Sequence, residues 1–308
     1  MKAIMYHYVR SYNPALPHFR FLDFGNFKKQ LDFFEQTCGF VTFEEWCQYM
    51  SDGAMPPVAG KVLLTFDDAL SCHFDCVFPE LKRRNLWGIF YVPTSPYTSG
   101  RILDVHRIHL LCGAFAGKEL LQYATSIVSR DMIPLSKVDE FEKATYATQH
   151  NDEGVSAFKR LLNYFVDYRY RPELINAIAR KFGLEFNVPN FYMTADQIAE
   201  MAAENMLVGS HTSSHPVMSR LSVAEQSTEI ASSFDFLSSI CTLPIRTYCH
   251  PYGGFHSFNR DTVRLLADFS VRFSFNVESR EIQSADRLRS IQHLPRFDCN
   301  EFQFGAAS

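Results

Sequence analysis

Short apolar runs alternate with segments of helical periodicity at the beginning and at the end of the chain. Apolar runs of this length are typical of buried strands, and the stretches between them, such as Asn26–Cys38 and Ser222–Leu237, place apolar residues at helical spacing. The alternation predicts an α/β fold with about seven strand–helix pairs and a parallel sheet. The predicted strands are Lys2–Tyr8, Lys61–Leu64, Gly88–Pro93, Met206–Ser210, Ile245–Cys249, Ser270–Phe275 and Ile291–Leu294.

The middle of the chain lacks this alternation. Residues 97–190 have mostly helical periodicity, which predicts a helical insertion between two parts of one α/β domain, residues 1–96 and 191–308. The expected helices of the insertion are Leu110–Tyr123, Phe141–Ala147, Val155–Tyr168 and Pro172–Phe182.

Composition narrows the class of protein. The chain has 308 residues, of which 46% are hydrophobic and 21% charged, and its net charge is −4. Lysine and arginine are scattered, so we expect no nucleic-acid partner. The apolar run after Lys2 is too short for a signal peptide, and no stretch has the ~20 apolar residues of a transmembrane segment. The eight cysteines form no disulfide framework, and we therefore expect a cytoplasmic protein. The oligomeric state cannot be predicted from this pattern.

Candidate chemistry lies directly after two predicted strands. Thr65-Phe66-Asp67-Asp68-Ala69 places two carboxylates at a strand end, where charge is costly to bury. Ser210-His211-Thr212-Ser213-Ser214-His215-Pro216 places two imidazoles four residues apart, either on one helical turn or in a tight loop. One carboxylate and two imidazoles make a divalent-metal site with an open position for water. The second carboxylate is then available as a general base, as in a metal-assisted hydrolase.

These two motifs resemble those of the polysaccharide deacetylases, the NodB-like family of carbohydrate esterases, which carry a T-F-D-D block and an H-[ST]-x-x-H block. The resemblance covers roughly residues 1–95 and 190–300. It implies a distorted (β/α)7 barrel with its site at the carboxyl ends of the strands. It also implies that Asp68, His211 and His215 hold a divalent cation, with zinc expected, and that Asp67 is the base that deprotonates the metal-bound water.

The third family motif, R-x-P-Y, is incomplete in this chain. In Tyr248-Cys249-His250-Pro251-Tyr252-Gly253-Gly254, Pro251 and Tyr252 match, and a backbone N–H after this turn could serve the oxyanion. The base-orienting arginine of the motif is missing, and Arg296 and Arg246 are its candidate replacements. We include Pro251, Tyr252, His250 and Arg296 among the expected substrate-binding residues.

The general acid of the family is a histidine near the end of the domain. His293, in Ile291-Gln292-His293-Leu294-Pro295-Arg296, lies in the corresponding region, and His7, at the end of the first strand, is its rival. The residue that protonates the leaving amine must come within hydrogen-bond reach of it.

The resemblance predicts a metal-dependent hydrolase that removes an N-acetyl group from an amino sugar in a cytosolic glycan or surface-polysaccharide precursor. Two alternatives stay open because the third motif is incomplete. One is a hydrolase of another amide, such as an N-formyl sugar or a cyclic amide. The other is a glycan-binding relative that has lost catalysis.

Overall fold

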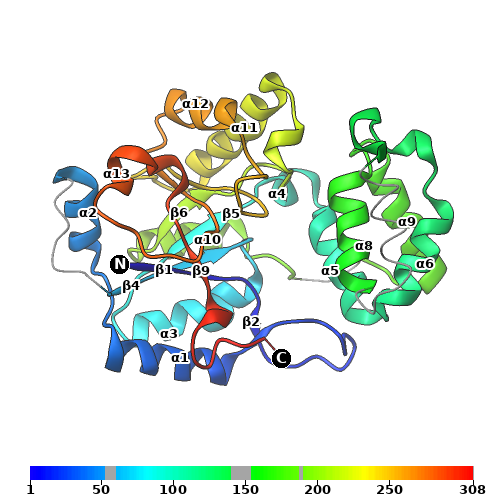
Figure 1. Cartoon of the computed structure of the whole chain (residues 1–308). Coiled ribbons are helices and arrows are strands. Elements are labelled where there is room, and N and C mark those ends of the chain that lie inside the picture. The colour runs from blue at the N-terminus through cyan, green and yellow to red at the C-terminus, as the bar shows by residue number, and fades with distance from the viewer. Residues whose placement is uncertain (53–59, 140–153, 187–189, 308) are drawn as a thin grey trace. The chain divides into compact units, whose positions relative to one another are not determined.

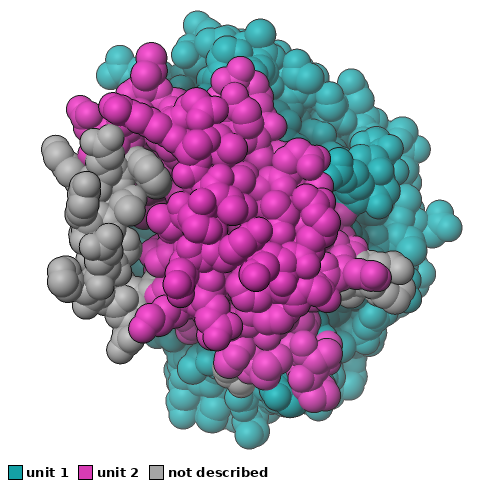
Figure 2. Space-filling model, turned by 90° about the vertical axis from the view of Figure 1, so that its right-hand side faces the viewer, with its two compact units in different colours: residues 1–12, 21–101, 190–308 teal, residues 13–20, 102–189 magenta. Residues whose placement is uncertain are grey.

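The computed structural model describes residues 1–52, 60–139, 154–186 and 190–307 (Figure 1). They form two compact units, which Figure 2 distinguishes by colour: unit 1 comprises residues 1–12, 21–101 and 190–308, and unit 2 comprises residues 13–20 and 102–189. The expected helix Phe141–Ala147 lies outside the described residues. Among the helices that are described, none combines the length and apolar character needed to cross a bilayer.

The core of unit 1 is a parallel sheet of seven strands, in the order β8-β7-β6-β5-β4-β1-β9. Neighbouring strands are all parallel, as expected when helices connect them. The predicted α/β fold, a distorted (β/α)7 barrel, is confirmed. The strands are β1 (Lys2–Tyr6), β4 (Val62–Asp67), β5 (Ile89–Val92), β6 (Leu207–Ser210), β7 (Thr247–Cys249), β8 (Phe273–Phe275) and β9 (Phe297–Asp298).

Residues 294–298, here called the closing segment, join the two edges of this sheet. Leu294 forms a parallel bridge with Phe275 of β8 at one edge. Three residues later, β9 pairs with β1 at the other edge. The prediction of a strand over Ile291–Leu294 is wrong, because residues 291–293 form a 3₁₀ turn. Ile291 and Leu294 are three residues apart, a spacing that places both side chains on one face of a 3₁₀ turn but on opposite faces of a strand.

Helices cover the outside of the sheet, and a separate cluster fills its interior. Side chains of α1, α3, α10 and α11 pack with outward-facing residues of the strands in one continuous core. The inward-facing residues pack around Trp46 of α2, whose ring lies 4.9 Å from that of Phe273. The helices of unit 1 are α1 (Phe24–Thr37), α2 (Phe43–Asp52), α3 (Phe78–Arg83), α4 (Ser95–Ser99), α10 (Ala195–Ala203), α11 (Val223–Ile240), α12 (Arg260–Asp268) and α13 (Asp286–Arg289).

Unit 2 has a core of its own, built from its helices. The predicted single helix Leu110–Tyr123 is wrong, since Phe115 is extended and separates two helices. A Cβ at Gly117, the first residue of the second helix, would lie 2.4 Å from Val155, so glycine allows α6 and α8 to approach closely. The described helices of this unit are α5 (Asp104–Ala114), α6 (Gly117–Ile127), α8 (Gly154–Arg160) and α9 (Arg171–Phe182).

Candidate metal centre and active site

The two adjacent aspartates lie at the carboxyl end of β4 and point to different partners. Asp67 is the last residue of the strand, and Asp68 follows with a φ of 83°. This left-handed conformation is uncommon for a residue with a side chain and marks a special backbone position. The Asp68 amide donates to the carbonyl of Tyr91 on β5, which fixes the turn. Both carboxylates are buried.

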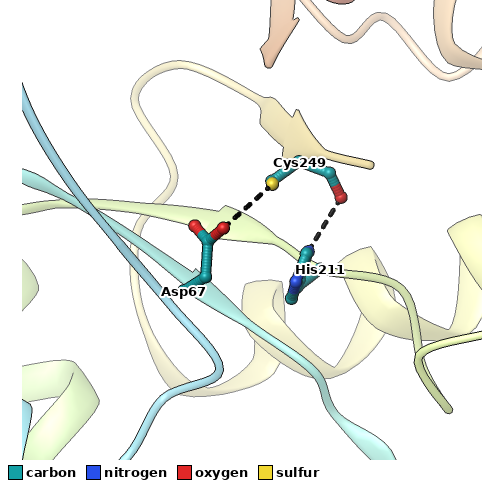
Figure 3. Close-up of side chains that lie close together, drawn as sticks. All are labelled: Asp67, His211 and Cys249. Atoms are coloured by element: carbon teal, nitrogen blue, oxygen red, sulfur yellow. Dashed lines mark hydrogen bonds between the residues drawn. The ribbon is translucent and has the colours of Figure 1, made fainter. Parts of the chain in front are cut away.

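The two histidines lie on a loop that follows β6 directly. Thr212 and His215 both have left-handed backbone, with φ values of 66° and 57°, so the segment is a tight loop and not a helical turn. Nδ1 of His211 lies 2.8 Å from the carbonyl oxygen of Cys249 on β7 (Figure 3). This hydrogen bond orients the ring and leaves Nε2 to face Asp68.

Three donor atoms converge at this point. Nε2 of His211 and Nε2 of His215 each lie 3.6 Å from Oδ1 of Asp68. Ligands bound about 2.0–2.2 Å from a tetrahedral zinc are separated by roughly 3.3–3.6 Å, so the spacing fits a divalent cation. Burial lowers the pKa of His211 despite the neighbouring carboxylates, which favours the neutral imidazole that binds metal. Asp68, His211 and His215 thus form a plausible metal site.

Arg296 of the closing segment holds Asp67 in place. Its Nη1 and Nη2 donate to Oδ1 and Oδ2 of Asp67 at 2.9 and 2.8 Å, a two-pronged geometry. Burial alone would raise the pKa of Asp67, but the charge and hydrogen bonds of Arg296 outweigh it and lower this pKa to about 2. Asp67 therefore stays ionised, and it is tied to a guanidinium rather than to the three metal-ligand donors.

Cys249, in the incomplete third motif, contacts both Asp67 and Arg296. The arginine of R-x-P-Y would stand at Cys249, two residues before Pro251. The Cys249 thiol lies 3.4 Å from Oδ2 of Asp67 (Figure 3). It also lies 2.9 Å from Nη2 of Arg296. Burial raises the pKa of this thiol well above its usual value, so it remains a neutral donor to Asp67. Sequence reasoning missed Cys249, although its position in the motif was a signal.

Of the two arginines considered, the structure brings Arg296 to Asp67. Arg246 instead donates to the carbonyl of Phe269, and its guanidinium lies over the ring of Phe234. The Arg296 side chain is 1% exposed. Its expected contact with substrate stays a prediction, and the contacts that the structure shows hold the carboxylate of Asp67.

His7 and His293, the two candidates for the acid, lie in different surroundings. Nε2 of His7 is 3.9 Å from Oδ2 of Asp68, on the carboxylate oxygen that does not face His211 and His215, and the side chain is 37% exposed. The ring of His293 packs against those of Phe255 and Phe258. The structure thus places His7 beside the candidate metal ligands and His293 in an aromatic cluster.

The sequence analysis overlooked a buried histidine, His73, which contacts the backbone of His7. Nε2 of His73 lies 2.7 Å from the carbonyl oxygen of His7, and burial lowers the pKa of His73 to about 4. A neutral ring donates to that carbonyl and fixes the backbone of His7. His73 begins a π-helical turn, His73–Val77, shortly after the aspartate turn, and π-turns are frequent at functional sites.

The remaining third-motif residues divide between site and core. The ring of Tyr252 lies 4.9 Å from that of His215, and its φ is 64°. Pro251 is buried beside it. His250 is 1% exposed, its ring stacks 3.9 Å from Phe258, and its Nε2 lies 2.8 Å from the carbonyl oxygen of Gln292. Its expected contact with substrate stays a prediction.

A (β/α) barrel with a candidate metal site at its strand ends defines the class of this protein, and comparisons show which known proteins it is similar to. The family model "Polysaccharide deacetylase" matches residues 168–274, which include both histidine ligands but not the aspartate pair. No protein of curated function matches the chain.

Solved structures agree with the family model. The deacetylase PplD of Streptococcus pyogenes, in complex with acetate, aligns at a TM-score of 0.60 and 16% identity over 97% of this chain and 91% of that one. BC0361, a polysaccharide deacetylase from Bacillus cereus, gives 0.54 and 13%, covering 96% of this chain and 64% of its own. The BpsB deacetylase domain of Bordetella bronchiseptica gives 0.52 and 13%, covering 96% and 94%. The predicted resemblance to the polysaccharide deacetylases is confirmed.

Proposed function

We propose that this protein is a metal-dependent N-deacetylase that acts on an N-acetylated amino sugar. The observation that carries the proposal is the convergence of Asp68, His211 and His215 beside a separately held carboxylate, Asp67. One carboxylate can serve as metal ligand and a second as base only if the two have different partners. The turn at Asp68 points Asp67 and Asp68 to different partners.

Each residue has a distinct task in this mechanism. Asp68, His211 and His215 would hold a divalent cation, which would supply Lewis acidity and lower the pKa of water. Asp67 accepts the proton of the attacking water on its carboxylate, which Arg296 orients. Water adds to the acetyl carbon, the C–N bond breaks, and acetate and the free amine leave. In this proposal a backbone N–H near Tyr252 donates to the oxyanion.

His7 gives the proton to the leaving amine in this proposal, because it lies next to Asp68 and its side chain is partly exposed. His7→Gln is expected to lower kcat by about 10²–10⁴-fold without loss of bound zinc. His293→Gln is the matched comparison and should leave kcat within a few-fold of wild type. Loss of zinc from His7→Gln would contradict the acid role and make His7 a ligand.

The substrate is expected to be a cytosolic glycan precursor, such as a nucleotide-linked or lipid-linked sugar for a surface polysaccharide. All eight cysteines lie in the described residues, and all are free thiols, which suits a reducing compartment. Fractionation of cells that produce the tagged full-length chain tests the location.

The experiment that tests the function measures bound metal and released acetate on the same preparations. Wild-type protein is expected to bind close to one zinc ion and to release acetate from an N-acetylglucosamine oligosaccharide. His211→Ala should lose both properties, whereas His18→Ala, at an exposed histidine of unit 2, should keep both. Wild-type protein that turns over N-formyl or cyclic amides but not N-acetyl sugars would favour the other hydrolase. No metal and no turnover would favour a binding protein.

A further inference from the structure

The loop that carries both histidine ligands has every backbone N–H from 211 to 215 engaged. Three of the five bonds are made to the strand region or within the loop itself, and the other two go to a carboxylate from a distant helix. The acceptors are the Val92 carbonyl for His211, Ser210 Oγ for Thr212, Glu229 Oε2 for both Ser213 and Ser214, and Thr212 Oγ1 for His215.

Glu229 makes three short contacts with this loop. Its Oε2 accepts from the amides of Ser213 and Ser214 at 2.9 and 2.8 Å, and its Oε1 accepts from the Ser214 hydroxyl at 2.6 Å. Hydrogen bonds to an ionised carboxylate are stronger than those between neutral groups. One side chain therefore fixes the two residues that lie between Thr212 and His215.

The loop needs such a restraint because its backbone is unfavourable. Thr212 and His215 are both left-handed, and Thr212 is β-branched, which makes this conformation a genuine outlier. Such residues persist only where their surroundings determine them. Two carbonyl groups of the loop are bonded as well. The amide of Thr94 donates to the carbonyl of Thr212 at 3.2 Å, and the amide of Ser95 donates to that of Ser213 at 2.9 Å.

The carboxylate is held on a rigid support. Glu229 lies on α11, and the next residue of this helix, Ile230, is fully buried. One turn later, Ser233 Oγ lies 2.6 Å from Ser210 Oγ, at the end of β6. The helix is thus bonded both to the strand before the loop and, through Glu229, to the loop itself.

We propose that Glu229 is a positioning residue of the metal centre, which sets the separation of His211 and His215 by holding the backbone between them. This inference rests on the proposed function, because it assumes that the two imidazoles bind a cation. Ser214 is exposed, so water can satisfy its amide when Glu229 is removed. The variant is therefore expected to fold, with an altered ligand geometry.

Zinc affinity of the apo-protein tests the proposal. Glu229→Ala is expected to weaken zinc binding by about 10–100-fold, the usual effect of removing a residue that orients metal ligands. Glu229→Gln retains one oxygen acceptor and should fall between wild type and alanine. The cobalt-substituted alanine variant should also show a changed visible absorption spectrum, a readout that a purely structural role would not move.

Glu225→Ala is the matched control. Glu225 lies one turn earlier on the same helix and also accepts a backbone amide, that of Ser222 at 2.8 Å, at the start of its own helix rather than in the metal loop. The zinc affinity of Glu225→Ala should equal that of wild type. The melting temperatures of apo Glu229→Ala, Glu229→Gln and Glu225→Ala should all lie within a few degrees of that of wild type.

Two results would overturn the proposal. Glu229→Ala that binds zinc within twofold of wild type, with the same cobalt spectrum, would show that the loop keeps its shape without the carboxylate. Equal losses in Glu229→Ala and Glu225→Ala would assign the effect to the helix and reject the positioning role. Wild-type protein that binds no zinc is a distinguishable outcome, since it would overturn the proposed function and this inference with it.

Discussion

Asp67→Asn is expected to reduce deacetylation by about 10²–10⁴-fold while the protein still binds zinc close to the wild-type ratio. The amide cannot accept a proton as the carboxylate does, yet it leaves the three donor atoms of Asp68, His211 and His215 untouched. Acetate release and zinc content, measured on the same preparation, check this expectation.

Asp68→Asn provides the contrast, because it changes the neighbouring carboxylate in the same way. A neutral amide at this position is a poorer ligand than an ionised carboxylate, so this variant should lose zinc and activity together. Asp67→Asn that lost zinc as fully as Asp68→Asn would contradict the division of roles and place both aspartates in the metal site.

Local pattern was sufficient to predict six of the seven parallel strands and the carboxylates and imidazoles that follow them. A buried strand such as β4 is a continuous apolar run, and the charged residues that interrupt it mark its end. In a parallel sheet such ends meet at one edge, so Asp68, His211 and His215 could be expected near one another without knowledge of the loop.

Local pattern could not decide which of the two candidate arginines contacts Asp67. Arg296 reaches it because the closing segment spans from β8 to β1, so its position depends on how the sheet closes. Arg246, the other candidate, directly precedes strand β7, just as Arg296 directly precedes β9. Residues 229 apart in sequence meet only through this closure, and no local periodicity encodes it.

The position of His7 illustrates the same limit. Its strand was evident from the pattern, but its proximity to Asp68 depends on the pairing of β1 with β4 and on His73, which binds its carbonyl. His293 was the more obvious candidate by chain order, and the 3₁₀ turn that replaces its expected strand turns it toward Phe255 and Phe258.

Arg296→Met is expected to lower the free energy of unfolding by about 3–5 kcal/mol and to reduce activity strongly. Both effects have one cause: the substitution leaves the carboxylate of Asp67 buried without its positive partner. Without the guanidinium, burial raises the pKa of Asp67, and a protonated Asp67 cannot act as a base. Denaturant unfolding and acetate release check the two parts.

The double variant Asp67→Asn/Arg296→Met separates the ion pair from the role of Arg296 in closing the barrel. If the pair carries the effect, the double variant should recover most of the stability that each single variant loses, because neither charge is then left alone, while activity stays absent. Additive losses in the double variant would contradict this. They would show that the Arg296 contacts with Thr65 Oγ1 and the Asn276 carbonyl, which join the closing segment to β4 and the end of β8, stabilise the barrel independently of Asp67.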